Sequence, residues 1–215
     1  MKIYTKKGDS GKSSIINGGI LSKKEYVFEV LGTMDELNAA LALAVVDNKS
    51  KISRTILGLQ EDLFSLGAVI ASYESSGDGD VSESKKRAGT ALAKSVKWTR
   101  TSSLGPDVRA MVLKSERLID ELSSDLPELK NFILPGGSIQ AKNLHISRAV
   151  CRRLERSFVS FVSQKDFVID DVSRDMLIYF NRLSDLLFVL ARYANHVQQI
   201  EDTIWLPKKF NEKVK

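Results

Sequence analysis

The stretch "KISRTILGLQEDLFSLGAVIAS", residues 51–72, carries a clear structural pattern. Its apolar residues recur at steps of three and four, at Ile52, Ile56, Leu59, Leu63, Leu66 and Ile70. Because an α-helix turns once in about 3.6 residues, this spacing places them on one face. The pattern predicts a long helix with one face turned towards a protein core.

A second helix is predicted on the N-terminal side of this one. The sequence "TMDE" is typical of a capping box, with Thr33 as the N-cap and Glu36 three residues later. The helix is expected to run to about Val46. Before it, "KIYT" (2–5) and "EYVFEVL" (25–31) are candidates for short extended pieces between glycine-rich turns.

Three further helices are predicted on the C-terminal side. The sequence at 105–126 restarts a helix, with Pro106 in its first turn. Ser138 is expected to cap a long helix that runs to about residue 163. Asp170 or Asp171 then opens a last helix, which ends near residue 199.

Four or five long helices without a sustained strand pattern predict an all-α fold, a bundle of about five long helices. The whole chain, 1–215, is expected to form a single domain. Residues 73–104 break the helical pattern and predict a long loop insertion. The polar residues 207–215 are expected to form a flexible tail.

The composition limits the kind of protein. The 215 residues are 43% hydrophobic and 27% charged, which suits one domain with a substantial core, and the net charge is +5. That charge suits anionic ligands such as nucleotides or nucleic acid without deciding between them. One cysteine excludes an intrachain disulfide, and two histidines leave little material for a zinc site.

No apolar run approaches the roughly 20 residues of a membrane span, so no membrane association is expected. The N-terminus also lacks the hydrophobic core of a signal peptide. A cytoplasmic protein is the simplest interpretation, or a protein of the mitochondrial matrix if a eukaryotic targeting peptide has been removed.

The N-terminal stretch "YTKKGDSGKSS" (4–14) resembles a phosphate-binding loop at first sight. A P-loop requires the pattern G-x-x-x-x-G-K-[ST] after a buried strand. Gly11-Lys12-Ser13 supplies the second half, but the first glycine would fall at Lys6. The spacing therefore argues against a P-loop.

Phosphate binding by this stretch stays open. Gly8 and Gly11 permit backbone conformations that turn N–H groups towards one anion. Hydroxyl groups and positive charge are added by Thr5, Ser13, Ser14, Lys6, Lys7 and Lys12. The alternative is a solvated N-terminal leader without a ligand.

The sequence "HISRAVCRRLERS" (145–157) places a row of arginines on a predicted helix. Arg148, Arg152 and Arg156 lie four residues apart and share one stripe. Like charges at this spacing repel one another, so the stripe needs either carboxylates on a neighbouring helix or an anion such as a polyphosphate. Glu155 lies three residues from Arg152 and could orient it.

The last predicted helix contains "MLIYFNRLSDLLFVLARYA" (176–194), which is strongly apolar around Asn181, Arg182, Ser184 and Asp185. Buried polar groups need partners, and Arg182 can reach Asp185 one turn on. These groups form either a structural bridge or, in the case of Asn181, a ligand contact.

The sequence "NFILPGGS" (131–138) predicts a sharp turn into a helix N-terminus, a place where anions bind. Phe132 in this turn either fills the core or lies beside a ligand.

Taken together and in this order, these segments resemble the PduO-type ATP:cob(I)alamin adenosyltransferases. The matching words are "IYTKKGDSGKSS", "LGTMDELNAALA", "FILPGGS", "SRAVCRRLER" and "NRLSDLLFVLARYAN". Apart from the loop at 73–104, the match covers nearly the whole chain. One of these motifs alone would be weak, but five in register are specific.

The resemblance implies a homotrimer of helical bundles with active sites between subunits. It also implies a reaction in which cob(I)alamin attacks the ribose C5′ of ATP and the whole triphosphate leaves. Such an enzyme needs Mg²⁺ and groups that stabilise a leaving polyanion, but no general base. Its expected partners are a reductase that prepares cobalt and an enzyme that uses adenosylcobalamin, with no nucleic acid and no membrane.

The resemblance also implies roles for single residues. The N-terminal ATP loop corresponds to Thr5, Lys6, Lys7, Gly8, Asp9, Gly11, Ser13 and Ser14, and Lys23 adds a further ATP contact. Arg152, Glu155 and Arg156 correspond to the phosphate and Mg²⁺ side of the site, and Asn181 to a nucleotide contact. Asp35 and Arg148 resemble a catalytic pair that bridges subunits.

Phe132 resembles the aromatic residue below the corrin ring. There it helps to keep the lower nitrogenous ligand off cobalt, which makes Co(II) easier to reduce.

Two other classes of function remain as alternatives. A P-loop-like ATPase or kinase would release ADP or a phosphorylated product instead of triphosphate. A non-enzymatic helical bundle that binds a corrinoid or nucleic acid is also compatible with the charge. However, the basic residues are dispersed, and no recognised nucleic-acid motif is present.

Overall fold

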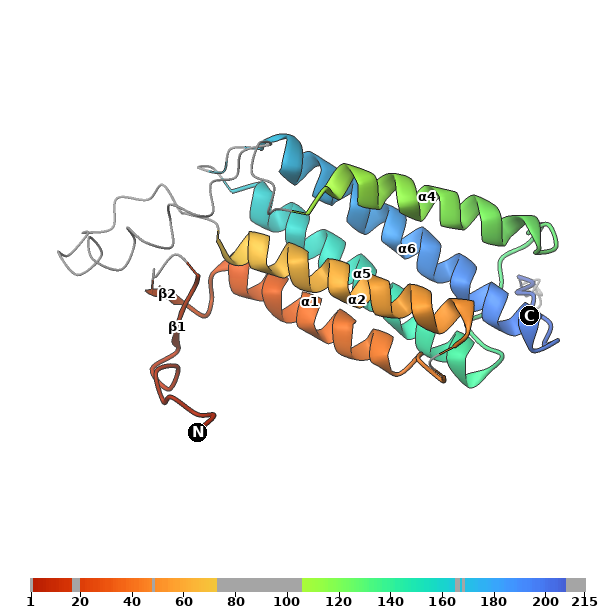
Figure 1. Ribbon diagram of the computed structural model, residues 1–215, viewed down its shortest axis with the longest axis horizontal. Coiled ribbons are helices and arrows are strands. Elements are labelled where there is room, and N and C mark those ends of the chain that lie inside the picture. Colours follow the sequence, from red (N-terminus) through yellow and green to blue (C-terminus); the bar gives the residue numbers. More distant parts are fainter. Residues whose placement is uncertain are drawn as a thin grey trace, which may run out of the picture.

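The computed structural model describes residues 2–16, 20–47, 49–72, 106–164, 167 and 169–207. Within them it contains five long α-helices: α1 (Tyr26–Ala42), α2 (Lys51–Ala71), α4 (Val108–Ser124), α5 (Ile139–Val162) and α6 (Asp171–Val197). Two short antiparallel strands, β1 (Lys12–Ser14) and β2 (Ile20–Ser22), form a hairpin. The helices lie along the long axis of the molecule, which confirms the predicted all-α bundle (Figure 1).

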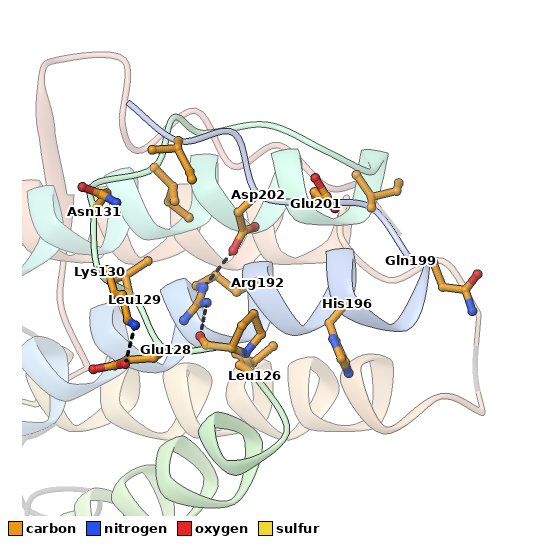
Figure 2. A pocket seen from close by; sticks show the side chains of 14 residues that line it. Leu126, Glu128, Leu129, Lys130, Asn131, Arg192, His196, Gln199, Glu201 and Asp202 are labelled. Carbon is orange, nitrogen blue, oxygen red and sulfur yellow. Dashed lines mark hydrogen bonds and ion pairs between the residues drawn. The ribbon is translucent and has the colours of Figure 1, made fainter. Parts of the chain in front are cut away.

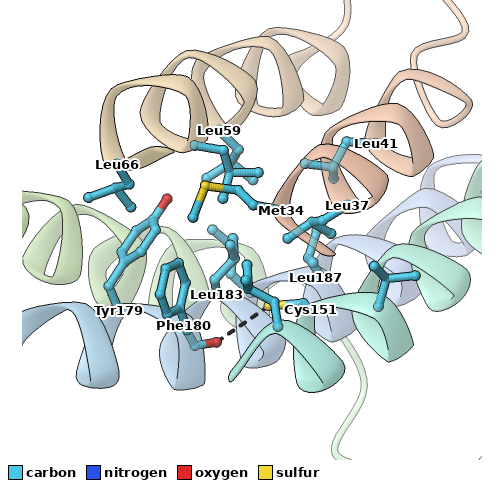
Figure 3. Close-up of a cluster of buried hydrophobic side chains, with 14 of the residues drawn as sticks. Met34, Leu37, Leu41, Leu59, Leu66, Cys151, Tyr179, Phe180, Leu183 and Leu187 are labelled. Atoms are coloured by element: carbon cyan, nitrogen blue, oxygen red, sulfur yellow. Dashed lines mark hydrogen bonds between the residues drawn. The ribbon is translucent and has the colours of Figure 1, made fainter. Parts of the chain in front are cut away.

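Helices α5 and α6 form the centre of the bundle. Helix α5 packs against both α1 and α6, helix α4 covers α6, and α2 lies on α1. All six apolar positions that predicted α2 are buried. Figure 3 shows Leu59 and Leu66 of this helix directed towards Met34, Tyr179 and the central helices. Each such side chain contributes about 1.5–3 kcal/mol on burial, so this packing holds the helical framework of any site.

The predicted starts of the last two helices are confirmed. The Ser138 side chain accepts a hydrogen bond from the backbone N–H of Ala141, 3.1 Å away. Asp170 accepts one from the backbone N–H of Ser173 at 2.8 Å. Such caps satisfy N–H groups that have no partner inside the helix. Pro106 lies just before the cap of α4, and not within its first turn as predicted, because Asp107 is the N-cap.

The predicted start of α1 is wrong. The helix begins at Tyr26, so the sequence 25–31 is helical and not extended. Thr33 lies inside the helix, where its hydroxyl donates a hydrogen bond to the Glu29 carbonyl at 2.8 Å. The cause is the buried face of α1, which continues upstream of Thr33 through Val27 and Val30. Residues 2–5 are not in a strand either.

The N-terminal hairpin and the C-terminal segment lie at opposite ends of the bundle (Figure 1). The predicted insertion at 73–104 and residues 208–215 of the predicted tail lie outside the described residues. Within the part of the chain that the structure describes, no helix is long and apolar enough to cross a membrane.

Candidate functional site

The arginine stripe lies on α5 as predicted. Arg152 and Arg156 are exposed, and Arg148 is half-buried. Among the described residues, no ion pair links any of the three to a carboxylate; Arg156 donates only to the Arg152 carbonyl, at 2.9 Å. Arg153, beside the stripe, pairs with Glu36 of α1. A carboxylate on the neighbouring helix therefore accounts for Arg153, while no carboxylate of the described residues pairs with the stripe.

Glu155 and Asn181 form a polar bridge between the central helices. The Asn181 amide donates a hydrogen bond to Glu155 Oε1 at 2.9 Å. The observed partner of Glu155 is thus Asn181, and not Arg152 as the spacing predicted. This contact places one half-buried carboxylate and one exposed amide beside the free arginines on the same face of α5 and α6.

Arg182, next to Asn181, has a structural role. Its Nε donates to Glu116 of α4 at 3.0 Å, and its Nη1 lies 3.3 Å from Asp185. The predicted bridge to Asp185 is confirmed, and the contact with Glu116 joins α6 to α4. Among the polar side chains of this apolar helix, Arg182 and Asp185 therefore take part in structural contacts, whereas Asn181 is exposed.

The N-terminal loop folds back on itself before β1. Gly11 has a left-handed backbone conformation, with φ at +75°, which favours glycine. Its carbonyl accepts a hydrogen bond from the backbone N–H of Lys23 at 2.9 Å. A Cβ placed on Gly8 would lie 3.0 Å from Lys23 Nζ, so this ammonium group lies against the loop. The structure thus places Lys23 against the loop, while its predicted contact with ATP stays a prediction.

The other predicted groups of the loop are open to solvent. The exposed side chains are those of Thr5, Lys6, Lys7, Asp9 and Ser14, and Ser13 is partly buried. Within the described ranges, no hydrogen bond or ion pair connects this loop to Arg152, Glu155 or Asn181. Among the described residues, the predicted phosphate-binding side chains therefore form two separate groups.

Asp35 and Arg148 do not form an ion pair in the chain that the structure describes. Asp35 is exposed on α1. The Nε of Arg148 is buried and has no hydrogen-bond partner among the described residues. The predicted pairing of the two across subunits is not tested by a single chain.

Phe132 is not part of the core, because 79% of its surface is exposed. Its ring meets Trp205 edge-on, with the ring centroids 6.4 Å apart. Both rings line a cavity of about 410 Å³ together with Leu129, Lys130, Asn131 and Pro207. The prediction that Phe132 fills the core is therefore wrong, because its ring forms an exposed aromatic surface with Trp205.

The turn after Phe132 is fixed by α6. Gly137 has φ at +93°, and any side chain there would collide with Asn195. The Asn195 amide accepts a hydrogen bond from the Ser138 N–H at 2.9 Å and donates one to the Gly136 carbonyl at 3.3 Å. Asn195 was not among the residues predicted from the sequence, although a buried polar residue at the end of an apolar helix needs a hydrogen-bond partner.

Burial shifts the pKa of two titratable groups on α5, Cys151 and His145. Burial raises the pKa of the Cys151 thiol far above its ordinary value, and the group stays protonated. Burial, and then the charge of Arg148, lower the pKa of His145. Among the described residues, no cluster of three or more His, Cys, Asp or Glu side chains could hold a metal ion by itself.

Comparison with known proteins shows which family has this arrangement of residues. The model of the cobalamin adenosyltransferase family matches residues 3–194. The chain belongs to this family. Membership confirms the predicted resemblance.

Two relatives show the extent of the similarity to other cobalamin adenosyltransferases. Corrinoid adenosyltransferase MMAB from Mus musculus is 36% identical over 207 residues, which cover 95% of this chain and 77% of the relative. The corrinoid adenosyltransferase of Bacillus subtilis is 34% identical over 207 residues, covering 94% and 91%.

Solved structures agree with this assignment. A variant of the PduO-type ATP:corrinoid adenosyltransferase from Lactobacillus reuteri, complexed with cobalamin and ATP, has a TM-score of 0.74 and 29% identity, covering 95% of this chain and 99% of that one. Another variant of that enzyme, complexed with ATP, has a TM-score of 0.73 and 29% identity, covering 95% and 100%. The fold predicted for this chain is therefore that of its family.

Proposed function

We propose that this protein transfers the 5′-deoxyadenosyl group of ATP to the cobalt of cob(I)alamin and releases triphosphate. The observation that carries the proposal is the arginine stripe on α5, which forms no ion pair with any described carboxylate and lies beside the bridge between Glu155 and Asn181. An unpaired row of guanidinium groups suits a polyanion, because each can donate two parallel hydrogen bonds to phosphate. In a cobalamin adenosyltransferase, the polyanion is the triphosphate of ATP.

The reaction explains which residue types the site contains. Cob(I)alamin, as substrate, supplies the electron pair that forms the cobalt–carbon bond at C5′. The bond between C5′ and the triphosphate oxygen breaks, and its electron pair leaves with the triphosphate. No proton is removed, so a general base is not required. The protein contributes orientation of ATP and stabilisation of the leaving charge, which Arg152 and Arg156 supply.

Glu155 is the proposed protein ligand of Mg²⁺. A single carboxylate fits such a site, because Mg²⁺ beside a nucleotide takes most of its ligands from phosphates and water. The hydrogen bond from Asn181 fixes one oxygen of this carboxylate. When bound, the ion would neutralise part of the charge on the triphosphate.

The site is proposed to be completed between subunits of a homotrimer. The N-terminal loop makes no hydrogen bond or ion pair with the α5–α6 face within the described chain, so a loop from a neighbouring subunit would complete the nucleotide site. Asp35 is exposed, and the Nε of Arg148 is buried without a hydrogen-bond partner among the described residues. Both observations support an ion pair between these residues across the boundary between subunits. The loop residues proposed to hold ATP are Thr5, Lys6, Lys7, Gly8, Asp9, Gly11, Ser13 and Ser14, with Lys23 beside them.

Phe132 is proposed to contact the corrin from below. Its exposed ring can cover the lower face of the macrocycle and exclude the nitrogenous ligand, which favours reduction of Co(II). A reductase would supply the electron, and an adenosylcobalamin-dependent enzyme would take the product. The proposed location is the cytoplasm, or the mitochondrial matrix for a eukaryotic chain.

The test follows both products of the reaction. The protein is incubated with ATP, Mg²⁺ and chemically reduced cobalamin; the absorbance of adenosylcobalamin is recorded, and nucleotides are separated by chromatography. The proposal expects adenosylcobalamin and intact triphosphate in equal amounts. ADP with no adenosylcobalamin, from a folded protein, would reject it in favour of the kinase-like alternative.

A further inference from the structure

The segment after α6 lies along the loop that carries Phe132. The N–H of Leu134 donates a hydrogen bond to the Thr203 carbonyl at 2.8 Å, and the N–H of Trp205 donates one to the Phe132 carbonyl at 2.8 Å. Ile133 and Ile204 form an antiparallel bridge between these contacts. The Phe132 backbone is therefore held as one half of a two-stranded ladder whose other half is residues 203–205.

A half-buried carboxylate, that of Asp202, fixes this segment to α6. Asp202 Oδ2 accepts a hydrogen bond from Arg192 Nε at 2.8 Å, and its Oδ1 accepts one from the Asn195 amide at 3.2 Å. The Arg192 and Asp202 side chains are only 9% and 18% exposed. Arg192 also donates to the Pro127 carbonyl at 2.7 Å, on the other side of the loop. Figure 2 shows the Arg192 guanidinium directed towards Asp202.

This network is unusual in the chain for its burial. The side chains of the other ion pairs between described residues are each at least 27% exposed. Exposed pairs contribute little, whereas removal of one partner from a buried pair leaves an unpaired charge at large cost. The network borders a cavity of about 540 Å³ next to the loop. We therefore expect this network, the clamp, to fix a residue whose position is important for function.

The group it holds is Phe132. With 79% of its surface exposed, that ring receives no positioning from the core. Its backbone is fixed by Trp205 N–H, and its ring by the edge of the Trp205 indole. Both contacts depend on the course of the chain at Asp202, three residues earlier.

We infer that Asp202 is a positioning residue for Phe132: held by Arg192 and Asn195, it fixes the segment 203–205 so that Trp205 sets the place of the corrin-facing ring. This rests on the proposed function, which assigns Phe132 to the corrin. Asp202 itself lies among protein partners and needs no contact with either substrate. Its loss should weaken handling of cobalamin and leave handling of ATP unchanged.

The first test is Asp202→Asn. Arg192 and Asn195 donate to different oxygens of Asp202, and in asparagine one of these two positions becomes an NH₂ donor, so one of the two contacts is lost. The Michaelis constant for reduced cobalamin is expected to rise about tenfold, since small misplacements at a reacting site are costly, while that for ATP stays within twofold. The matched control is Glu201→Gln, which changes the adjacent exposed carboxylate and should leave both constants unchanged.

A second readout does not depend on turnover. With cob(II)alamin and ATP, electron paramagnetic resonance reports the fraction of cobalt without a lower ligand. That fraction should fall in Asp202→Asn and stay at the wild-type level in Glu201→Gln. A purely structural role would instead lower the melting temperature and affect ATP and cobalamin alike, and that result would overturn the inference.

A variant in the exposed part of the clamp covers the case in which Asp202→Asn does not fold. Trp205 is 46% exposed, so Trp205→Ala leaves the core intact. It should reproduce the loss for cobalamin, and Trp205→Phe should restore most of it. Wild-type-like behaviour of Trp205→Ala would overturn the inference with the proposed function intact. A wild-type protein without any adenosylcobalamin product would reject the function itself.

Discussion

The two ends of the bundle carry the two loops of the candidate site, and they are held in different ways. At one end, the N-terminal loop is fixed by backbone hydrogen bonds and by the left-handed Gly11. At the other, the Phe132 loop is clamped by a buried ion pair and by Asn195 (Figures 1 and 2). The first loop is open and can adapt to a flexible triphosphate. The second is preorganised, which suits a rigid macrocycle.

Helix α5 runs between these ends and carries the arginine stripe. Its 24 residues span about 36 Å at 1.5 Å per residue. A nucleotide is too short to cover that length within one chain. The two loops are therefore expected to serve different substrates, and substitutions at each place should have separable effects.

The largest effect is expected at Arg152. Arg152→Ala removes a guanidinium group from the leaving triphosphate, and preorganised charge of this kind contributes about 10²–10³-fold to turnover. Steady-state formation of adenosylcobalamin measures the loss. Arg174→Ala, which removes an exposed arginine paired with Asp171 on α6, is the control. Near-wild-type turnover in Arg152→Ala would show that α5 is not the phosphate side.

Phe132→Ala should produce the next largest effect, restricted to one substrate. Loss of the ring is expected to slow the step that involves Co(II) reduction about tenfold or more, because the lower ligand is no longer excluded. The dissociation constant for ATP, measured by calorimetry, should not change. If both substrates bind more weakly, the two ends of the bundle do not act separately.

How much of this could be read from the sequence depends on how local each signal is. The face of α2 and the caps Ser138 and Asp170 are local patterns, and each was predicted correctly. The start of α1 was missed because β-branched and aromatic residues precede a false capping signal at Thr33. The spacing of Val27, Val30, Met34 and Leu37 would have corrected it.

The clamp formed by Arg192, Asn195 and Asp202 was not predicted, although the sequence around Arg192 indicated that this residue needs a partner. Arg192 stands in an otherwise apolar turn of α6, and a buried charge requires a partner. The partner, Asp202, lies beyond the helix end, where the chain reverses after Gln199 with φ at +54°. Local patterns do not fix the direction of such a reversal. Nor could they show that Glu155 bonds Asn181 across two helices.

A smaller effect is expected at Gly11, and it tests the open loop. Alanine at a left-handed position costs about 1–2 kcal/mol, although no atom lies within 4 Å of the added Cβ. Gly11→Ala should therefore raise the Michaelis constant for ATP several-fold and leave that for cobalamin unchanged. Gly32→Ala, inside α1 and also with open space around it, is the control and should slightly raise stability. Equal effects on both substrates would contradict an ATP-only loop.

The smallest effect concerns His145, a buried side chain of α5 that lies three residues before Arg148. Burial lowers the pKa of His145 from its ordinary value near 6.5, with Arg148 acting in the same direction and Asp202 against it. The unfolded chain therefore binds more protons at this residue, so its contribution to stability is present above about pH 6.5 and is lost as the pH falls. Urea unfolding at pH 7.5 and pH 5.5 should show this loss in the wild type and a smaller one in His145→Gln. Equal losses in the two proteins would mean that His145 is not held neutral, and that the interior face of α5 is wetter than its burial indicates.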